Sequence, residues 1–305
     1  MLRATFRQLQ IFESVARHLN FTRASEELFI TQSSVSLQVK QLSESLSCAL
    51  IEQVGNKLYL TQPGKALLNH CQHLLVELKD IENDMLSFID KPQGRISVSC
   101  TITAQFFLPR IFGGFNKKYP DVDLELKVVT RPEINERMSN NRDDLYIVSR
   151  IPSHLEVKAV PFLENPMIAI APFNHPLTKE KNIPLTRLIE ERFLIREPGS
   201  ATLKEIEKFY SDNKITLRPH MILGGNEAIK QGVIGELGIS ILSRFTSVLE
   251  LKMNLLCELD VDGFPLKGQW HATYPASKKL TPIVHTFLDY IKTEGSEIAK
   301  RCLTV

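Results

Sequence analysis

Apolar residues in the first fifty positions recur every three or four residues, which is the period of a helix with one buried face. A first helix is predicted from Phe6, closed by Asn20, and its apolar face consists of Leu9, Phe12, Ala16 and Leu19. A second helix is predicted over Thr22 to Leu28, with Thr22 as its N-cap. The small Ala24 would let a neighbouring helix approach this second helix closely.

A third helix is predicted after Thr31, which is a suitable N-cap residue. Its buried stripe consists of Val35, Val39, Leu42 and Leu46, at i, i+4, i+7 and i+11. The helical period places a second set of residues on the opposite side. That set is Ser33, Ser36, Leu37, Lys40 and Gln41, with Gln32 and Ser34 at its edge. The exposed face is therefore short, polar and nearly uncharged.

This polar face favours contact with DNA. A solvated helix carries Glu and Lys in pairs four residues apart, whereas Gln and Ser hydrogen-bond to base edges and a cation binds phosphate. Leu37 lies outside the core on this pattern, where it could contact a thymine methyl group or a neighbouring helix. The candidate DNA-binding residues are Thr22, Arg23, Thr31, Gln32, Ser33, Ser34, Ser36, Leu37, Gln38, Lys40 and Lys57.

A β-hairpin is predicted from Ile51 to Leu60, because apolar-containing flanks surround a Gly55-Asn56 turn. Lys57 would then lie near the minor groove or a phosphate. The hairpin otherwise offers few cations, so we expect it to add modest affinity while the third helix carries sequence specificity.

Heptad-spaced apolar residues follow the Pro63-Gly64 pair and predict one long helix. They are Leu67, Cys71, Leu74, Leu78, Ile81, Met85 and Phe88, in alternating steps of four and three. This spacing is the a/d seam of a coiled coil, so we expect two chains to pair through it. Leu68, Leu75 and Leu86 widen the stripe, as expected for a helix packed on its own domain. Two recognition helices joined in this way would read half-sites about 10 bp apart or a multiple of that distance.

Beyond residue 92 the pattern changes to strands that alternate with helices. Strands are predicted at Arg95 to Cys100 and Val122 to Val129, and shorter ones begin at Leu145, Met167, Phe193, Met221 and Gly238. This alternation predicts mostly parallel sheets. Such sheets bind ligands at the carboxyl ends of their strands, where helix N-termini present free amides to anions.

Three segments at strand ends have suitable chemistry: residues 101–105, residues 195–202, and residues 224–242, in which a helix is predicted to start at Asn226. The first and the third could equally serve as helix caps. Arg131 and Arg150 lie just beyond two strands, where they could neutralise an anion or be ordinary surface arginines. The candidate effector-binding residues are Thr101, Thr103, Gln105, Arg131, Arg150, Arg196, Gly199, Ser200, Thr202, Asn226 and Glu227.

Composition narrows the class of protein. The 305 residues carry a net charge of +2, and residues 1–60 hold six Lys and Arg against five Asp and Glu. DNA binding must therefore depend on local geometry rather than on overall charge. Five scattered cysteines without C-x-x-C spacing predict neither disulfides nor a zinc site, and no metal or cofactor is expected. With no signal peptide and no run of about 18 apolar residues, we expect a cytoplasmic protein without a membrane partner.

Two segments resemble the DNA-binding domain of LysR-type transcriptional regulators: FTRASEELFITQSSVSLQVKQLSESL (Phe21 to Leu46) and LIEQVGNKLYLTQPG (Leu50 to Gly64). The resemblance implies an α/β protein with a winged helix-turn-helix, DNA-bound dimers within a tetramer, and an effector domain like periplasmic binding proteins. The domains would be residues 1–61, a linker helix at 62–91, and an effector domain at 92–305. Wings in this family usually carry more arginine than this one.

Four further segments resemble the CbbR branch of the family, which controls carbon-fixation operons: FLENPMIAIAPFNHPL, REPGSAT, NEAIKQ and LDVDGFP. The resemblance implies an effector such as a sugar phosphate, an organic acid or a nicotinamide nucleotide. It also implies two lobes, residues 92–165 with 270–305 and residues 166–269, with the effector between them. Where the branch often shows S-T-A-N-Y-F, this chain lacks the hydroxyls at Ile102 and Phe106.

The function predicted from these patterns is effector-modulated promoter binding and activation, with RNA polymerase as a further partner. A LysR-type regulator of an unrelated metabolic operon is the alternative. An enzyme is disfavoured because no G-x-S-x-G, H-E-x-x-H, P-loop or G-x-G-x-x-G motif occurs in a convincing context. A solute-binding protein for uptake is disfavoured because a DNA-reading segment precedes the α/β module.

Overall fold

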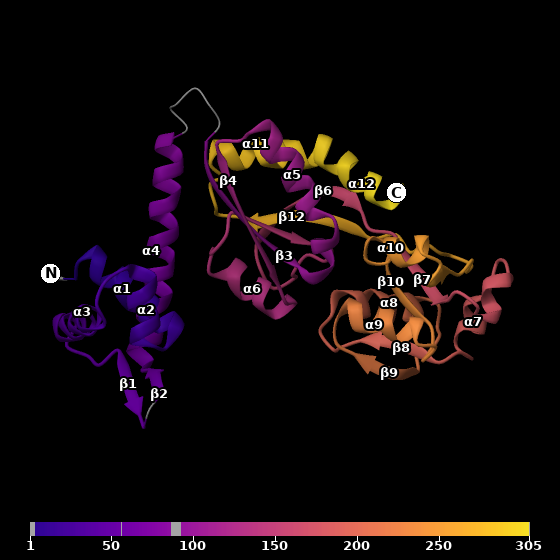
Figure 1. The fold of residues 1–305 in the computed structure, drawn as a ribbon, viewed down its shortest axis with the longest axis horizontal. Helices are drawn as coiled ribbons and strands as arrows, with labels where there is room; N and C mark the ends of the chain where they lie inside the picture. Colours follow the sequence, from indigo (N-terminus) through magenta and orange to yellow (C-terminus); the bar gives the residue numbers. More distant parts are fainter. Residues whose placement is uncertain (1–3, 56, 87–92, 305) are drawn as a thin grey trace. The chain divides into compact units, whose positions relative to one another are not determined.

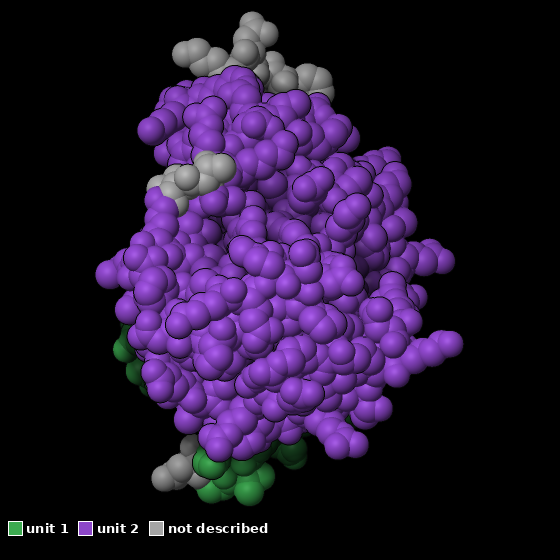
Figure 2. Space-filling model, turned by 90° about the vertical axis from the view of Figure 1, so that its right-hand side faces the viewer, with its two compact units in different colours: residues 1–82, 140–142 green, residues 83–139, 143–305 purple. Residues whose placement is uncertain are grey.

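The computed structural model of the chain describes residues 4–55, 57–86 and 93–304 (Figure 1). It divides into two compact units, one of residues 1–82 with 140–142 and the other of residues 83–139 and 143–305 (Figure 2). Each unit has its own hydrophobic core. The predicted turn residue Asn56, the last seam residue Phe88 and the side chain of Leu86 lie outside the described part of the chain.

The first unit contains three short helices, a hairpin and most of one long helix. Its elements are α1 (Phe6–His18), α2 (Phe21–Leu28), α3 (Gln32–Ser45), β1 (Ile51–Val54), β2 (Lys57–Leu60) and α4 (Gln62–Leu86). β1 and β2 pair antiparallel, with Val54 opposite Lys57, which confirms the predicted hairpin. The three helices enclose a core in which Phe12, Ala24 and Val35 are completely buried. The predicted stripe of α3 is buried at Val35, Val39 and Leu42, while Leu46 is only half-buried.

Two predicted helix ends differ in the structure. α1 ends at His18, and Leu19 adopts the left-handed conformation as its C-cap. Asn20 then starts α2, because its Oδ1 atom accepts hydrogen bonds from the backbone amides of Thr22 and Arg23 at 2.8 and 3.1 Å. Thr22 was predicted to cap this helix, and that is wrong, since it lies inside the first turn. A short asparagine side chain reaches amides two and three residues ahead, so it displaces the threonine as cap.

The apolar stripe of α4 has two different surroundings along the helix. Near its start Cys71 is buried and Leu67 packs against the core of the first unit. Gly64 is required in the first turn, because a Cβ atom there would lie 2.0 Å from the backbone oxygen of Leu50. Further along, the predicted seam is exposed within one chain at Leu74, Leu78, Ile81 and Met85. The helix therefore packs on its own domain at one end and leaves an apolar face uncovered along the rest.

The second unit is a two-lobed α/β domain. The sheet of lobe I has the strand order β4-β3-β5-β12-β6. Its elements are β3 (Gly94–Thr101), η1 (Ile102–Phe106), α5 (Leu108–Lys118), β4 (Val122–Val129), α6 (Arg131–Ser139), β5 (Leu145–Val148), β6 (Val157–Glu164), β12 (Gln269–Pro275), α11 (Pro282–Tyr290), η4 (Ile291–Gly295) and α12 (Ser296–Thr304). Helices α5, α11 and α12 pack on the face that carries Ile96 and Val98, and α6 covers the opposite face near Tyr146.

Lobe II contains the three-stranded sheet β10-β7-β11 and the pair β8-β9. Its elements are β7 (Met167–Pro172), η2 (Pro176–Lys179), α7 (Leu185–Leu188), β8 (Phe193–Arg196), α8 (Ala201–Asp212), β9 (Pro219–Leu223), α9 (Gly225–Ile234), β10 (Ser240–Ser243), η3 (Arg244–Thr246), α10 (Val248–Lys252) and β11 (Leu256–Glu258). Along β7, alternate residues enter two different cores, with Ala169 packed toward α8 and Ile168 toward α9.

The expectation of mostly parallel sheets holds for only part of the domain. β3 pairs parallel with β4 and β5, and β8 pairs parallel with β9. In contrast, β12 is antiparallel to both β5 and β6, and β7 is antiparallel to both β10 and β11. The sequence pattern did not predict β6, β11 or β12. Pro161 interrupts the pattern of β6 and is tolerated there because β6 is an edge strand with an irregular register at this point.

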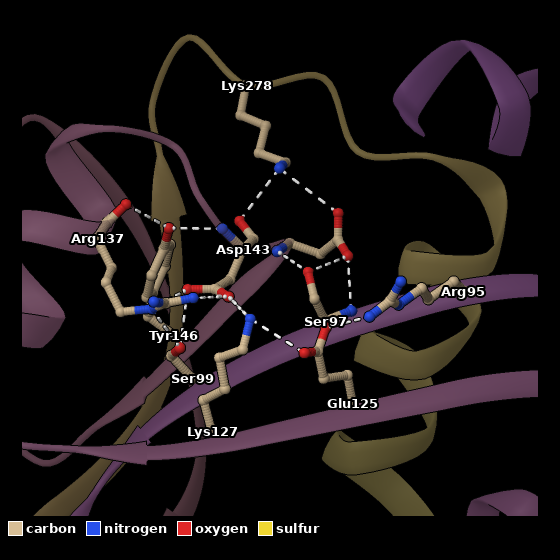
Figure 3. Close-up of polar contacts among 10 residues, drawn as sticks. Arg95, Ser97, Ser99, Glu125, Lys127, Arg137, Asp143, Tyr146 and Lys278 are labelled. Atoms are coloured by element: carbon tan, nitrogen blue, oxygen red, sulfur yellow. Dashed lines mark hydrogen bonds and ion pairs between the residues drawn. The ribbon is translucent and has the colours of Figure 1, made fainter. Parts of the chain in front are cut away.

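A buried polar network joins α6 to the sheet of lobe I (Figure 3). Arg137 of α6 donates from Nε and Nη2 to the two carboxylate oxygens of Asp143 at 2.8 and 2.7 Å. Ser99 of β3 donates to the same carboxylate, and the Tyr146 hydroxyl donates to the backbone oxygen of Arg137 at 2.7 Å. Asp143 is 1% exposed. The network therefore fixes the C-terminal part of α6 against β3 and β5.

We expect Asp143→Ala to destabilise lobe I by about 3–5 kcal/mol, because it leaves the buried Arg137 guanidinium without its partner. Urea unfolding followed by the fluorescence of Trp270, the single tryptophan and a member of the lobe I core, measures this change. Glu294→Ala is the matched control, because it breaks an exposed pair with Lys118 and should leave the midpoint nearly unchanged. Equal midpoints for the two variants would contradict the prediction.

Candidate nucleic-acid interface and ligand pocket

The N-terminal half of α3 presents the polar face that the sequence predicts. Thr31 caps the helix, since its Oγ1 atom accepts from the Ser34 amide at 3.2 Å. The same hydroxyl lies 3.1 Å from Ser33 Oγ and 2.8 Å from Ser34 Oγ. Most of the predicted residues are exposed and Gln38 is half-buried; the exposed ones are Thr22, Arg23, Thr31, Gln32, Ser33, Ser34, Ser36, Leu37, Lys40 and Lys57. The structure thus places these donors and acceptors on accessible parts of the first unit.

Two apolar side chains lie on the surface beside this face. Leu37 is 52% exposed, so the described part of the chain leaves about half of this side chain accessible. Phe29 is 95% exposed and occupies the left-handed C-cap position of α2, two residues before the cap of α3. Sequence reasoning did not select Phe29, because its place between two helical patterns gave no sign of whether it is buried.

The charges around α3 suit an anionic partner. Its first turn contains no acidic residue, and the N-terminus of a helix carries partial positive charge. Thr22 and Arg23 occupy the first turn of α2, where their backbone amides donate to Asn20 while their side chains are exposed. Lys40 lies 4.0 Å from Glu44 across one turn, a weak exposed pair that leaves the lysine available. A phosphate backbone fits these positions.

A cavity of 270 Å³ lies between lobe I and lobe II. It is lined from lobe I by the ends of β3, β4 and β5 and the start of α6, and from lobe II by the turn between β8 and α8. The lining residues are Thr101, Ile102, Thr103, Val129, Thr130, Arg131, Pro132, Ser149, Arg196, Glu197, Pro198, Gly199, Ser200, Ala201 and Thr202. Seven of the eleven candidate effector-binding residues are among them: Thr101, Thr103, Arg131, Arg196, Gly199, Ser200 and Thr202.

Arg131 supplies a positive charge to this cavity, and the carboxylate of Glu205 offsets that charge only through space. Its Nη1 atom is buried and has no hydrogen-bond partner in the described protein. Burial, together with the nearby charge of Arg150, lowers the pKa of the Arg131 guanidinium from its ordinary value. A buried guanidinium N–H without an acceptor is costly, so this atom favours an anionic oxygen from a ligand.

Arg196 has a different environment, because its positive charge is already neutralised. Its Nε and Nη2 atoms each donate to a carboxylate oxygen of Glu197 at 2.7 Å. Its Nη1 atom donates to the amide oxygen of Asn226. Burial alone would raise the pKa of Glu197, but the hydrogen bonds from Arg196 and from the backbone amide of Gly225 outweigh it and lower that pKa. Arg196 therefore holds the wall of the cavity together in this structure.

Helix N-termini add positive potential around the cavity. The 3₁₀-helix η1 begins at Ile102, α6 begins at Arg131 and α8 begins at Ala201. The N-cap residues Thr101 and Ser200 make no side-chain capping hydrogen bond, so their hydroxyls do not occupy the first-turn amides. Free amides at a helix start bind anions. With the Arg131 guanidinium, the arrangement suits a small molecule with phosphate or carboxylate groups.

Four candidate residues do not line the cavity. Gln105 is exposed on η1, and Arg150 pairs with Glu205 at 3.6 Å. Glu227 pairs with Lys230 at 2.9 Å on α9. Asn226 lies behind the wall, where it accepts from Arg196 and donates from Nδ2 to Thr103 Oγ1 at 3.1 Å. Asn226 is the second residue of α9 rather than its cap, which is Gly224.

Sequence reasoning missed several lining residues, of which Thr130, Ser149 and Glu197 bear polar groups. Thr130 directly follows β4 and Ser149 directly follows β5, just as Thr101 ends β3. The rule that ligands bind at the carboxyl ends of parallel strands applies to both, so it could have found them. Glu197 was missed because a carboxylate is not expected in an anion site. Among the residues that the structure describes, no group of His, Cys, Asp and Glu could hold a metal ion.

A winged helix-turn-helix unit joined to a two-lobed domain with an anion-receptive cavity defines a ligand-responsive DNA-binding regulator. Residues 6–65 match the bacterial regulatory helix-turn-helix protein of the lysR family, and residues 90–296 match the LysR substrate binding domain. The chain belongs to the LysR family of transcriptional regulators.

Similar curated proteins are transcriptional regulators, one of them of a RuBisCO operon. The chain is 41% identical over 291 residues to the HTH-type transcriptional activator CmpR of Synechocystis sp., covering 95% of this chain and 96% of CmpR. It is also 41% identical over 288 residues to the RuBisCO operon transcriptional regulator of Acidithiobacillus ferrooxidans, covering 94% of this chain and 93% of that protein. The resemblance to the CbbR branch is thereby confirmed.

Solved structures show the same architecture. The CcmR regulatory domain of Synechocystis in complex with 2-PG is 42% identical, covers 67% of this chain and 98% of that domain, and superposes with a TM-score of 0.63. Full-length CbnR complexed with its target DNA is 18% identical, covers 94% of this chain and 99% of CbnR, and superposes with a TM-score of 0.72. CbnR thus shares the fold over 94% of this chain. Across the part of the chain that is described, no helix has the length and apolar character needed to span a bilayer.

We expect the triple variant Ser33→Ala, Ser36→Ala and Lys40→Ala to bind its promoter at least about tenfold more weakly, because base-edge and phosphate contacts are lost. Fluorescence anisotropy at several salt concentrations measures the affinity, and the salt dependence should also decrease because a lysine is removed. The control triple variant is Ser153→Ala, Ser211→Ala and Lys267→Ala, which removes exposed side chains of the same types from the second unit. Unchanged promoter affinity in the folded α3 variant would remove the role of this face.

Proposed function

We propose that this regulator controls carbon-metabolism promoters and senses a small phosphorylated carboxylate, of the type represented by 2-phosphoglycolate (2-PG). The effector binds in the cavity between the lobes, with one anionic group on Arg131. The observation that carries the proposal is the buried, unpartnered Nη1 atom of Arg131 in that cavity. The 42% identical CcmR regulatory domain with 2-PG supports the same ligand class.

The size of the cavity favours the small members of the ligand classes expected from the sequence. Pockets for drug-sized ligands have volumes of roughly 300–1,000 Å³. At 270 Å³ this cavity lies just below that range, so it favours a two- or three-carbon acid phosphate over a nicotinamide nucleotide. The unpartnered Nη1 atom of Arg131 offers one donor to a ligand, which also favours a compact anion over a sugar bisphosphate. Ile102 and Pro132 give the cavity part of an apolar wall, which suits a short carbon backbone.

The DNA-binding role that we propose for α3 is major-groove recognition. The polar face from Gln32 to Lys40 reads base edges, while Thr22, Arg23 and Thr31 contact phosphates. The hairpin adds little charge beyond Lys57, so it contributes less affinity than α3. RNA polymerase is the further partner at the promoter. Ligand binding acts on these steps through its differential affinity for two states of the two-lobed domain, without catalysis.

Self-association is proposed through the uncovered part of α4. Leu74, Leu78, Ile81 and Met85 follow heptad spacing and are exposed in a single chain. Pairing of two such faces removes them from water, which favours dimers and, with contacts of the effector domains, a tetramer. Two DNA-binding units are then joined for paired half-sites.

The Arg131→Ala variant should bind 2-PG at least about tenfold more weakly, because a charge-assisted hydrogen bond contributes about 1.5–3 kcal/mol. Isothermal titration calorimetry measures the affinity, and footprints at carbon-fixation promoters with and without 2-PG measure the response. Arg110→Ala, an exposed arginine of α5, is the control and should titrate like the parent. If the parent fails to bind 2-PG, or if its footprints lie only at other promoters, the proposed function is wrong.

We expect Leu78→Asp to convert the assembly into smaller species, since it places a charge in the paired apolar seam. Light scattering coupled to size-exclusion chromatography gives the molar mass. His73→Asp introduces the same side chain at an exposed position outside the seam and should retain the parent mass. Identical masses for both variants would show that chains assemble through another surface.

A further inference from the structure

Glu197 occupies a receptor that is built to bind a carboxylate. Three donors converge on its side chain: Nε and Nη2 of Arg196 at 2.7 Å each, and the backbone amide of Gly225 at 3.1 Å. A planar guanidinium that donates from two nitrogens, together with a helix-start amide, is the geometry in which proteins hold carboxylate ligands. Here the bound carboxylate comes from the adjacent residue of the same chain.

The two partners differ in how firmly the protein holds them. The Arg196 side chain is 5% exposed, whereas the Glu197 side chain is 41% exposed. Arg196 is fixed further by its hydrogen bond to Asn226. A buried guanidinium requires an anionic partner, but a half-exposed carboxylate can turn into solvent without a large desolvation cost. The arginine is thus a permanent part of the cavity wall, while the glutamate is replaceable.

We infer that Arg196 and the Gly225 amide form a second anion subsite of the cavity, which Glu197 fills in the unliganded protein and from which a carboxylate of the effector displaces it. Both Arg196 and Glu197 line the same cavity as Arg131. A ligand with two anionic groups therefore takes one at Arg131 and one at this subsite. The inference rests on the proposed function, because it assigns the second group of the same effector.

Displacement of Glu197 from this subsite affects α9, a helix that contacts both lobes. Gly225 is the first residue of α9, and the next residue, Asn226, accepts from Arg196 while it donates to Thr103 of lobe I. Lys230 of the same helix lies 5.2 Å from the centre of the Phe106 ring in lobe I. When a ligand carboxylate replaces Glu197, the Gly225 amide at the start of α9 donates to the ligand instead of to Glu197. The effector thereby alters an element that contacts both lobes.

A purely structural role for the Arg196–Glu197 pair predicts the opposite effect of mutation. If Glu197 only aligned Arg196, its removal would weaken effector binding, because the cavity wall would lose its order. If Glu197 competes with the effector, its removal strengthens binding, because an intramolecular competitor at high effective concentration is lost. The sign of the change therefore separates the two roles.

The experiment compares the full-length parent, Glu197→Ala and Glu197→Gln in calorimetric titrations with 2-PG, and in thermal melts with acetate against chloride at equal ionic strength. We expect both variants to bind 2-PG about tenfold or more tightly than the parent. Acetate should raise the melting temperature of Glu197→Ala and leave that of the parent unchanged, since it refills the vacated subsite. Glu190→Ala, which breaks the surface pair with Arg187, is the control and should show neither effect.

Each outcome separates the inference from the proposed function. If the parent binds 2-PG but folded Glu197 variants bind it equally or more weakly, the subsite is wrong and the proposed effector stands. If the parent does not bind 2-PG while acetate stabilises Glu197→Ala, the effector class is wrong and the subsite stands. If Glu197→Ala does not fold even in acetate, the titration with 2-PG is decided by Glu197→Gln. This variant keeps the side-chain volume and loses the charge.

Discussion

A buried guanidinium N–H without an acceptor is the constraint on which the cavity between the lobes depends. The Nη1 atom of Arg131 makes no hydrogen bond within the described protein, and such burial costs free energy unless an anion arrives. The guanidinium remains in place because α6 is fixed at its other end, where Arg137 binds Asp143 and the Tyr146 hydroxyl binds the helix backbone (Figure 3). The network at the C-terminal end of α6 thus holds Arg131, the first residue of this helix, in its place at the cavity.

The two arginines of the cavity have different roles in the proposed effector site. Arg131 has an Nη1 atom without a hydrogen-bond partner in the described protein, while the guanidinium of Arg196 is paired with Glu197. A cavity with two free guanidiniums would attract any anion strongly and would be destabilised by their mutual repulsion. Partial neutralisation by a chain carboxylate reduces that repulsion and raises the selectivity for a ligand with two anionic groups. In the proposed effector site, affinity and control therefore depend on the same pair of charges.

Local periodicity predicted the elements whose two faces differ. The helix α3 and its cap Thr31 were predicted because Val35, Val39 and Leu42 form a stripe, and β4 was predicted with its observed ends. Elements that lack a clean local pattern were missed, such as β6, whose Pro161 is acceptable only at a sheet edge. The antiparallel pairing of β7 with β10 and β11 was missed because the partners of a strand are set by tertiary packing rather than by its own residues.

The candidate sites show the same limit of local reasoning. Strand ends indicated Thr101 and Arg131, since parallel strands of one sheet bring their carboxyl ends together. The pairing of Arg196 with its neighbour Glu197 and with Asn226, thirty residues away, could not be predicted, because it depends on side-chain orientation. A charged residue in a motif therefore indicates where a site lies, but its partners decide whether that charge is available to a ligand.

A crystal structure of the effector domain with 2-PG tests the central claim most directly. The account predicts an anionic oxygen of the ligand within hydrogen-bond distance of Arg131 Nη1, inside the cavity between the lobes. A ligand bound elsewhere, or bound in the cavity with Arg131 Nη1 still lacking an acceptor, would contradict it.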